Sequence, residues 1–253
     1  MKYEFTGETK DVNGVTLKQI RALVTIVGVV ASGEAGGWIE SEHNLSQEAK
    51  AWVYGDARVS GNAQVSGNAQ VYGDAWVSGN AQVYGNAQVS GNAQVYGNAR
   101  VSGNARVSGN AQVSGNAQVY GNARVSGNAR VYGDARVSGN AQVYGDAWVY
   151  GDAWVYGNAQ VSGNAQVYGN AQVSGDARVY GNADWCAFVG FGSQHRQTTA
   201  FIDAKIGVRI VCGCFTGSIE EFRSAIVKTH GAESKNGKLY LSMANMIELR
   251  MQN

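Results

Sequence analysis

Proline is absent from this 253-residue chain, and cysteine and histidine occur only three times each. The cysteines Cys186, Cys212 and Cys214 are odd in number and lie in the last third, which disfavours a disulfide framework and favours a reduced compartment. The first residues do not read as a signal peptide, and the longest apolar run, Ala22 to Ala31, is too short to span a membrane. We therefore expect a cytoplasmic protein without a membrane partner.

The chain also has no excess of positive or negative charge, because its formal net charge is only +1. A protein that binds nucleic acid through its backbone phosphates usually carries a basic field, so nucleic acid is not an expected partner. Residues 51–182 contain no threonine, histidine, cysteine or lysine. An ice-binding face needs regular rows of threonine, and the sequence therefore argues against that function.

What is present is a six-residue repeat that runs without a break from Ala51 to Asn182. Each of the 22 hexads reads Ala-x-Val-(Ser/Tyr)-Gly-(Asn/Asp). On an extended strand Ala and Val point to one side, while x and Ser/Tyr point to the other. Glycine followed by Asn or Asp tolerates the left-handed backbone region and predicts a corner. Each hexad is therefore expected to form one short strand and one corner.

Three strands per turn close such a chain into a triangular coil of 18 residues. The repeat then makes about seven coils stacked about 4.8 Å apart, with Ala and Val inside and all other hexad side chains outside. The pattern resembles the hexapeptide repeat of left-handed parallel β-helices, and the handedness is implied by that resemblance. The predicted fold class is mainly β: a left-handed parallel β-helix with an N-terminal β cap and a small C-terminal α+β domain.

Two segments flank the repeat. Residues 1–50 contain Asn13-Gly14 between two strand-like runs, which predicts a hairpin, and we interpret this segment as an N-terminal cap. Between the two flanking segments, residues 51–183 are expected to form the β-helix. Residues 184–253 are expected to contain three short strands (188–192, 198–204 and 207–215) and two helices, the first opened by a capping box at Ser218 and Glu221.

A second resemblance concerns the entry to the rod and the C-terminal segment. Gly-Gly-Trp-Ile-Glu (36–40), Asn-Leu-Ser-Gln (44–47) and Cys-Gly-Cys-Phe-Thr-Gly-Ser (212–218) are similar to hexapeptide-repeat proteins of enterobacterial, phage and prophage type. Some of those proteins are classed as acyltransferases on their fold alone. An acyltransferase needs a general base, usually His, and a loop thrown out of a coil. The three histidines lie outside the uninterrupted repeat, so the sequence favours a protein that is not an enzyme.

Aromatic side chains gather on the last coils of the repeat. Residues 18 apart should stack, and in three places an arginine precedes a tryptophan by one coil, which predicts a cation–π pair. These side chains either stabilise the stack or form an apolar patch for a protein partner or for self-association. The predicted partner-binding residues are Arg130, Tyr132, Arg136, Trp148, Tyr150, Trp154, Tyr156 and Tyr168.

Two weaker sites lie after the repeat. The loop from Gly190 to Thr199 combines hydroxyls, a guanidinium and flexible backbone, so it is either a polar turn or a site for a small anionic, nucleotide-like ligand. We expect no cofactor and no metal, the weak alternative being a zinc site made by the three cysteines and His195. The candidate anion-binding residues are Ser193, His195, Arg196, Thr198 and Thr199.

These observations favour a binding or scaffolding protein in which a rigid rod fixes geometry and its aromatic rows or C-terminal domain meet a partner. The alternatives are an acyltransferase-like enzyme and a small-anion binding protein.

Overall fold

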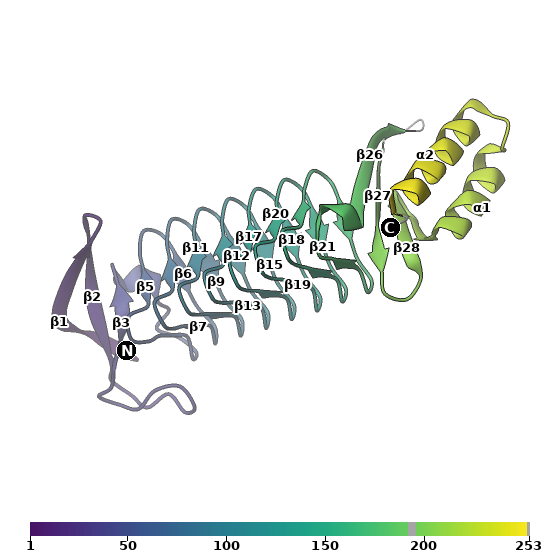
Figure 1. Ribbon diagram of the computed structural model, residues 1–253. Helices are drawn as coiled ribbons and strands as arrows, with labels where there is room; N and C mark the ends of the chain where they lie inside the picture. Colours follow the sequence, from purple (N-terminus) through teal and green to yellow (C-terminus); the bar gives the residue numbers. More distant parts are fainter. Residues whose placement is uncertain (192–195, 252–253) are drawn as a thin grey trace.

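The computed structural model describes residues 1–191 and 196–251, which fold as a three-sided rod with a strand region at one end and a small domain at the other (Figure 1). Every hexad forms a two-residue strand followed by a bend. All hexad alanines and valines from Ala51 to Val179 have 0% exposed surface. The predicted inside and outside positions of Ala and Val are therefore confirmed.

The corners depend on glycine for two reasons. The hexad glycines from Gly55 to Gly175 have φ between 53° and 71°, the left-handed region that β-carbons disfavour. The turns also approach closely there, because a β-carbon added to Gly91 would lie 3.0 Å from the backbone of Gly109. At a corner such as Gly91, a larger residue would be strained in its own backbone and would press on the next turn.

Successive turns pair in parallel with a period of 18 residues: Gln88 pairs with Arg106, and Val89 with Val107. The backbone N–H of each outward residue donates to the next turn, as Gln88 N does to Ala105 O (2.9 Å). The paired strands form three faces, named here faces 1, 2 and 3.

Face 1 contains β3 (Ala35–Ile39), β5 (Arg58–Val59), β8 (Trp76–Val77), β11 (Gln94–Val95), β14 (Gln112–Val113), β17 (Arg130–Val131), β20 (Trp148–Val149) and β23 (Gln166–Val167). Face 2 contains β6 (Gln64–Val65), β9 (Gln82–Val83), β12 (Arg100–Val101), β15 (Gln118–Val119), β18 (Arg136–Val137), β21 (Trp154–Val155) and β24 (Gln172–Val173). Face 3 contains β4 (Trp52–Val53), β7 (Gln70–Val71), β10 (Gln88–Val89), β13 (Arg106–Val107), β16 (Arg124–Val125), β19 (Gln142–Val143), β22 (Gln160–Val161) and β25 (Arg178–Val179).

The first turn begins before the hexads. β3 pairs in parallel with β5, and Leu45, just after the 3-10 turn η1 (Glu42–Asn44), forms a parallel bridge with Val65. Together with β4 these segments complete one more turn, so the rod has eight turns. The sequence predicts about seven turns because that count includes only the hexads, which begin at residue 51.

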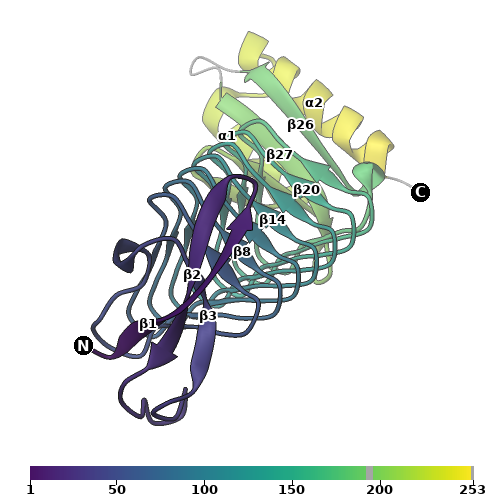
Figure 2. The ribbon, with the colours of Figure 1, turned by 90° about the vertical axis from the view of Figure 1, so that its left-hand side faces the viewer.

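A hairpin covers the N-terminal end (Figure 2). β1 (Tyr3–Val12) and β2 (Val15–Ala22) pair antiparallel around Asn13 and Gly14, both with positive φ, and β2 continues onto β3. This confirms the hairpin prediction. The hairpin also corrects the prediction that every hexad tryptophan is outside: Trp52 has 0% exposure, because Tyr3 packs edge-on against it at 6.4 Å.

The C-terminal cap domain begins after the 3-10 turn η2 (Asn182–Asp184). A four-stranded antiparallel sheet consists of β26 (Trp185–Phe191), β27 (Arg196–Asp203), β28 (Gly207–Cys212) and β29 (Phe215–Ser218), followed by α1 (Ile219–His230) and α2 (Lys235–Met251). The third predicted strand is thus two strands, because Gly213 turns the chain with φ 63°. Ser218 and Glu221 form the expected capping box. Among the described residues no helix is long and apolar enough to cross a membrane.

The cap sheet lies between the end of the rod and the two helices. Phe201 and Val211 join the core of the rod, while Ala200 and Ile210 pack with the helices. Side chains near the junction also accept N–H groups of the last turn that have no further turn to pair with. Gln166 N donates to Asn182 Oδ1 (2.8 Å), and Gln172 N donates to Thr199 Oγ1 (3.3 Å). The open end of the rod is therefore satisfied by side chains as well as by packing.

Candidate binding site

A column of stacked rings runs along face 1 toward the cap domain. Tyr132 and Tyr150 stack with centroids 5.0 Å apart and planes 1° apart, and Tyr150 stacks on Tyr168 at 5.3 Å and 20°. Trp185 of β26 then meets Tyr168 edge-on at 5.2 Å. Burial, together with the neighbouring Tyr150, raises the pKa of Tyr132. The predicted tyrosine column is present, and it continues into the cap domain.

Two of the three predicted arginine–tryptophan pairs form cation–π contacts. The Arg130 guanidinium lies 5.1 Å from the Trp148 ring, and that of Arg58 lies 5.7 Å from Trp76. Arg136 and Trp154 are neighbours in the stack, but the structure records no cation–π contact between these two described residues.

Trp154 has other partners. Its indole N–H donates to Ser138 Oγ (3.1 Å), and its ring packs on Tyr156 at 4.6 Å. Tyr156 follows Trp154 in the same hexad and contacts the ring that the arginine was expected to cover. The prediction of a third cation–π pair is therefore wrong.

The predicted aromatic patch is divided into two groups. Trp148 contacts Tyr132 on face 1 (6.3 Å), whereas Trp154 contacts Tyr156 on face 2, and the corner at Gly151 and Asp152 lies between the two faces. The four aromatic side chains on this turn, Trp148, Tyr150, Trp154 and Tyr156, are half-buried. A partner that touches both aromatic groups would therefore have to bind at the corner between faces 1 and 2.

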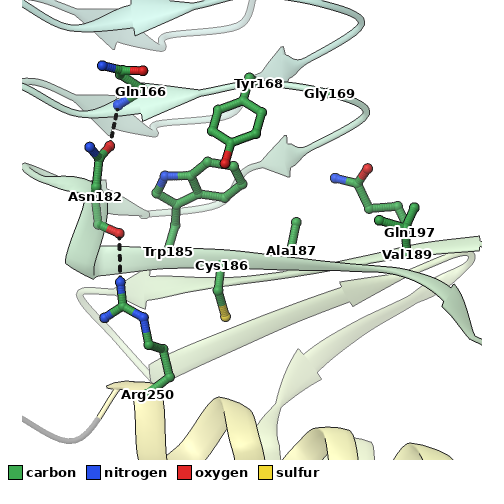
Figure 3. Close-up of a pocket in the computed structure, with 10 residues that line it drawn as sticks. All are labelled: Gln166, Tyr168, Gly169, Asn182, Trp185, Cys186, Ala187, Val189, Gln197 and Arg250. Atoms are coloured by element: carbon green, nitrogen blue, oxygen red, sulfur yellow. Dashed lines mark hydrogen bonds between the residues drawn. The ribbon is translucent and has the colours of Figure 1, made fainter.

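Beside the end of the column lies a cleft of about 640 Å³, the junction cleft (Figure 3). The last rung of face 1 forms one side, β26 forms the other, and Asn182 and Arg250 lie together at one end. Arg250 is the one charged residue among those that line it. The lining residues are Gln166, Tyr168, Gly169, Asn182, Trp185, Cys186, Ala187, Val189, Gln197 and Arg250.

Polar groups of the cleft are held in place by hydrogen bonds. The Arg250 guanidinium donates to the carbonyl oxygens of Asn182 (3.1 Å) and Ala183 (3.4 Å), and Gln197 Oε1 accepts from Asn170 N (3.2 Å). Burial raises the pKa of the Cys186 thiol to about 11, although Arg250 acts in the opposite direction. The thiol is thus protonated at neutral pH, and the cleft offers hydrogen bonds and one positive charge rather than a nucleophile.

A second hollow, of about 430 Å³, lies on the corner between faces 1 and 2. Its lining includes Arg136 and Trp154, with Asp134 and Asp152 stacked on successive turns. Both of these hollows lie on the last turns of the rod, whereas a hollow of about 360 Å³ beside Val27 and Asn68 lies at its N-terminal end.

The repeat sequence matches one family model, the YdcK β-solenoid repeat, over residues 51–115, 117–157 and 171–183. The rod is thus similar to the YdcK β-solenoid repeat. The matched segments cover just under half of the chain and lie within the rod. A search of the curated proteins gave no match.

The predicted anion-binding residues are not all part of one site at the end of the rod. Ser193, His195 and the side chain of Arg196 lie outside the described residues. Thr198 and Thr199 are buried in β27 and are neighbours on opposite faces of the sheet. Thr198 Oγ1 donates to Cys212 Sγ (3.0 Å), and Thr199 Oγ1 accepts the N–H of the last rung of face 2. Both hydroxyls are therefore engaged inside the fold.

Two of the cysteines face the helices. Cys186 and Cys212 are half-buried against the hydrophobic cluster there, whereas Cys214 is exposed in the turn after β28. Cys214 does not share the strand face of Cys212, because the strand ends at the turn of Gly213. In residues 1–191 and 196–251 no group of three potential ligands is placed to hold a metal ion. His195, the fourth proposed ligand, lies outside that part of the chain.

The other histidines lie at opposite ends of the rod. His43 Nε2 is 2.9 Å from the side-chain nitrogen of Gln64, and His230 stacks on Tyr240 at 5.3 Å. Neither residue lines the junction cleft.

Sequence reasoning missed the residues that make the junction cleft, chiefly Trp185, Gln197 and Arg250. Only Trp185 could have been predicted from the repeat, because it follows Val167 by the same 18 residues that separate Val149 from Val167. Continuing the 18-residue period by one more turn would have identified Trp185 as the end of the valine core. Gln197 and Arg250 come from the non-repeating cap domain, and no local pattern places them beside the rod.

Proposed function

We propose that this protein is a binding scaffold: a rigid rod that holds two different ends apart and meets a protein partner at its C-terminal third. The observation that carries the proposal is that stacked outward aromatic rings lie beside the junction cleft and the corner hollow on the last turns of the rod. Interfaces favour tyrosine, tryptophan and arginine beside a concave surface. The stacked rings also hold the surface rigid, which lowers the entropy cost of binding.

A double substitution tests the proposal. Trp148→Gln with Trp154→Gln restores the commonest outward residue of the hexads and keeps every core position. We expect normal folding with loss of the partner in pull-down from the natural host, or of self-association in sedimentation.

The matched control is Trp76→Gln, because Trp76 carries the same arginine contact and the same indole bond to a serine on an N-terminal turn. This control should retain the partner. Equal binding by the double variant and the wild type would overturn the proposal.

The same proposal includes a phage- or prophage-type origin and a cytoplasmic location. The supporting observations are the similarity of residues 36–47 and 212–218 to such proteins and three cysteines that are all free. Fractionation of the host with an antibody against the chain tests the location, and recovery in the periplasm would contradict it.

A further inference from the structure

β26 is an unprotected edge strand. It is the terminal strand of the cap sheet and pairs on one side only, with β27. Alternate residues of an antiparallel strand point their N–H and C=O groups away from the partner, so the outer edge of β26 presents a row of unused backbone groups.

Its composition distinguishes this edge from the others. Residues 185–191 read Trp-Cys-Ala-Phe-Val-Gly-Phe and carry no charge. The edge strand at the other end, β1, contains Glu4, Glu8, Lys10 and Asp11 and has an irregular register, features that discourage pairing with another chain. β29, the opposite edge of the cap sheet, has only four residues. The register of β26 on β27 is also irregular, but only between Phe188 and Phe191, where Gly190 has φ 84°. Residues 185–188 therefore form a regular, uncharged apolar edge.

The junction cleft lies along this strand. Ala187 is exposed and Val189 is 67% exposed, and both line the cleft on the side of the sheet that faces the rod. Gly169 on the facing corner leaves room where a side chain would otherwise stand. The space beside β26 can therefore take alternate side chains of an added strand.

Charge sets the direction in which such a strand would lie. Arg250 is exposed and its guanidinium bonds only to two backbone carbonyls, with no carboxylate within 4 Å in the part of the chain that the structure describes. It lies with Asn182 at the start of β26, while Gln197 lies at the far end of the cleft (Figure 3). A carboxylate at Arg250 would neutralise the one charge of the cleft.

We propose that the junction cleft binds the C-terminal segment of a partner protein as an extended strand that pairs antiparallel with β26 and places its terminal carboxylate at Arg250. Antiparallel pairing continues the order of the cap sheet, and backbone hydrogen bonds supply affinity without demanding one sequence. This inference rests on the proposed binding function and names the chemistry of the partner.

The test begins with a library of random heptapeptides displayed with free C-terminal carboxylates against the full-length protein. The strongest binder is then synthesised as the free acid, as the C-terminal amide, and with alternate backbone nitrogens methylated. We expect the amide and the methylated peptide each to bind about tenfold more weakly than the free acid, because each loses hydrogen bonds to a charged or backbone group.

Variants of the protein locate the binding. Arg250→Gln should weaken the free acid about tenfold and leave the amide unchanged, whereas Arg178→Gln, an exposed arginine on the last rung of face 3, should change neither. Val189→Lys adds a charge at an exposed position of β26 and should abolish binding without lowering the melting temperature. Amide exchange of residues 185–191 should slow in saturating peptide, while that of Gln112 and Val113 in the middle of the rod stays the same.

Several results would overturn the proposal: no selected peptide, equal affinity for acid and amide, or unchanged exchange in β26. A dimer in sedimentation that Val189→Lys disrupts and that peptide cannot displace would assign the edge to a second copy of the chain instead. Loss of the partner in the Trp148/Trp154 variant together with failure of every peptide would leave the proposed function standing and remove only this inference.

Discussion

Asn116 donates its side-chain Nδ2 to Oδ1 of Asp134, one turn further along the rod, across 2.9 Å. It is the last bond of a ladder in which each corner asparagine donates to the next, and all three corners have such a ladder. Each ladder runs toward the C-terminus and ends on an aspartate: Asp134, Asp146 or Asp176. An ionised aspartate only accepts hydrogen bonds, so it can end a ladder of this direction but cannot continue one.

The ladders predict that Asn→Asp in the middle of a ladder destabilises the rod, whereas Asp→Asn at its end does not. Asn122→Asp in the middle of a ladder still accepts from Asn104 but sets a carboxylate against the oxygen of Asn140, and we expect a loss of about 1 kcal/mol. Asp134→Asn keeps the acceptor of Asn116 and should be nearly neutral. Urea denaturation at neutral pH measures both, and equal free energies of unfolding for the two variants would contradict the ladder account.

The core predicts a sharp contrast between neighbours on one strand. Val119 is fully buried between turns, so Val119→Asp places an unpaired charge where there is no water, at a cost of several kcal/mol. Gln118 points outward, and Gln118→Glu should change little. Circular dichroism of the purified variants tests this, and comparable melting temperatures would show that the assignment of inside and outside is wrong.

Turn-by-turn pairing predicts that the rod tolerates loss of a whole turn. Deleting residues 105–122 removes β13, β14 and β15, after which β10 can pair with β16 in the same register. We expect a folded rod shorter by one turn, about 4.8 Å, in small-angle scattering. A six-residue deletion should also fold but rotate the cap domain to another face. An unfolded product from the 18-residue deletion, with both ends intact, would contradict the three-sided turn.

The junction of rod and cap predicts a loss of stability in acid. Asp203 is 2% exposed and accepts from Arg209 Nε (2.7 Å). Burial by itself raises the pKa of Asp203, but the bond to Arg209 and the amides of Lys205 and Ile206 hold it below its usual value of 3.8. A lowered folded pKa means that the stabilisation is complete above 3.8 and is lost as the pH falls through the lower folded value.

Asp203→Asn should therefore cost about 3 kcal/mol at pH 7, because it leaves Arg209 without its ion-pair partner in the junction. The difference from the wild type should shrink as the pH falls below 3.8. Urea titrations at both pH values, monitored by amide exchange in β27, provide the measurement. A difference that stays constant with pH would show that the ion pair does not stabilise the junction.

The repeat could be predicted well from sequence because one period sets every position in it. Ala and Val at fixed spacing determine the core, and residues 18 apart, such as Tyr132 and Tyr150, stack without further information. Long-range packing explains the failures. Trp52 has the same place in its hexad as Trp148, yet the N-terminal hairpin buries it. The junction cleft depends on how the cap domain docks, which brings Arg250 beside Asn182 across 68 residues.

The most direct test of the binding account is site-specific photo-crosslinking in the natural host. A photoreactive phenylalanine replaces Tyr150 or Tyr156 on the last turns, or their counterparts Tyr96 and Tyr84 in the same two columns nearer the N-terminus. All four positions are outward tyrosines, and circular dichroism of each variant checks that the substitution leaves the fold intact. We predict that positions 150 and 156 crosslink one and the same partner and that positions 96 and 84 do not. Equal crosslinking along the rod, or none at positions 150 and 156, would contradict a partner surface at the C-terminal third.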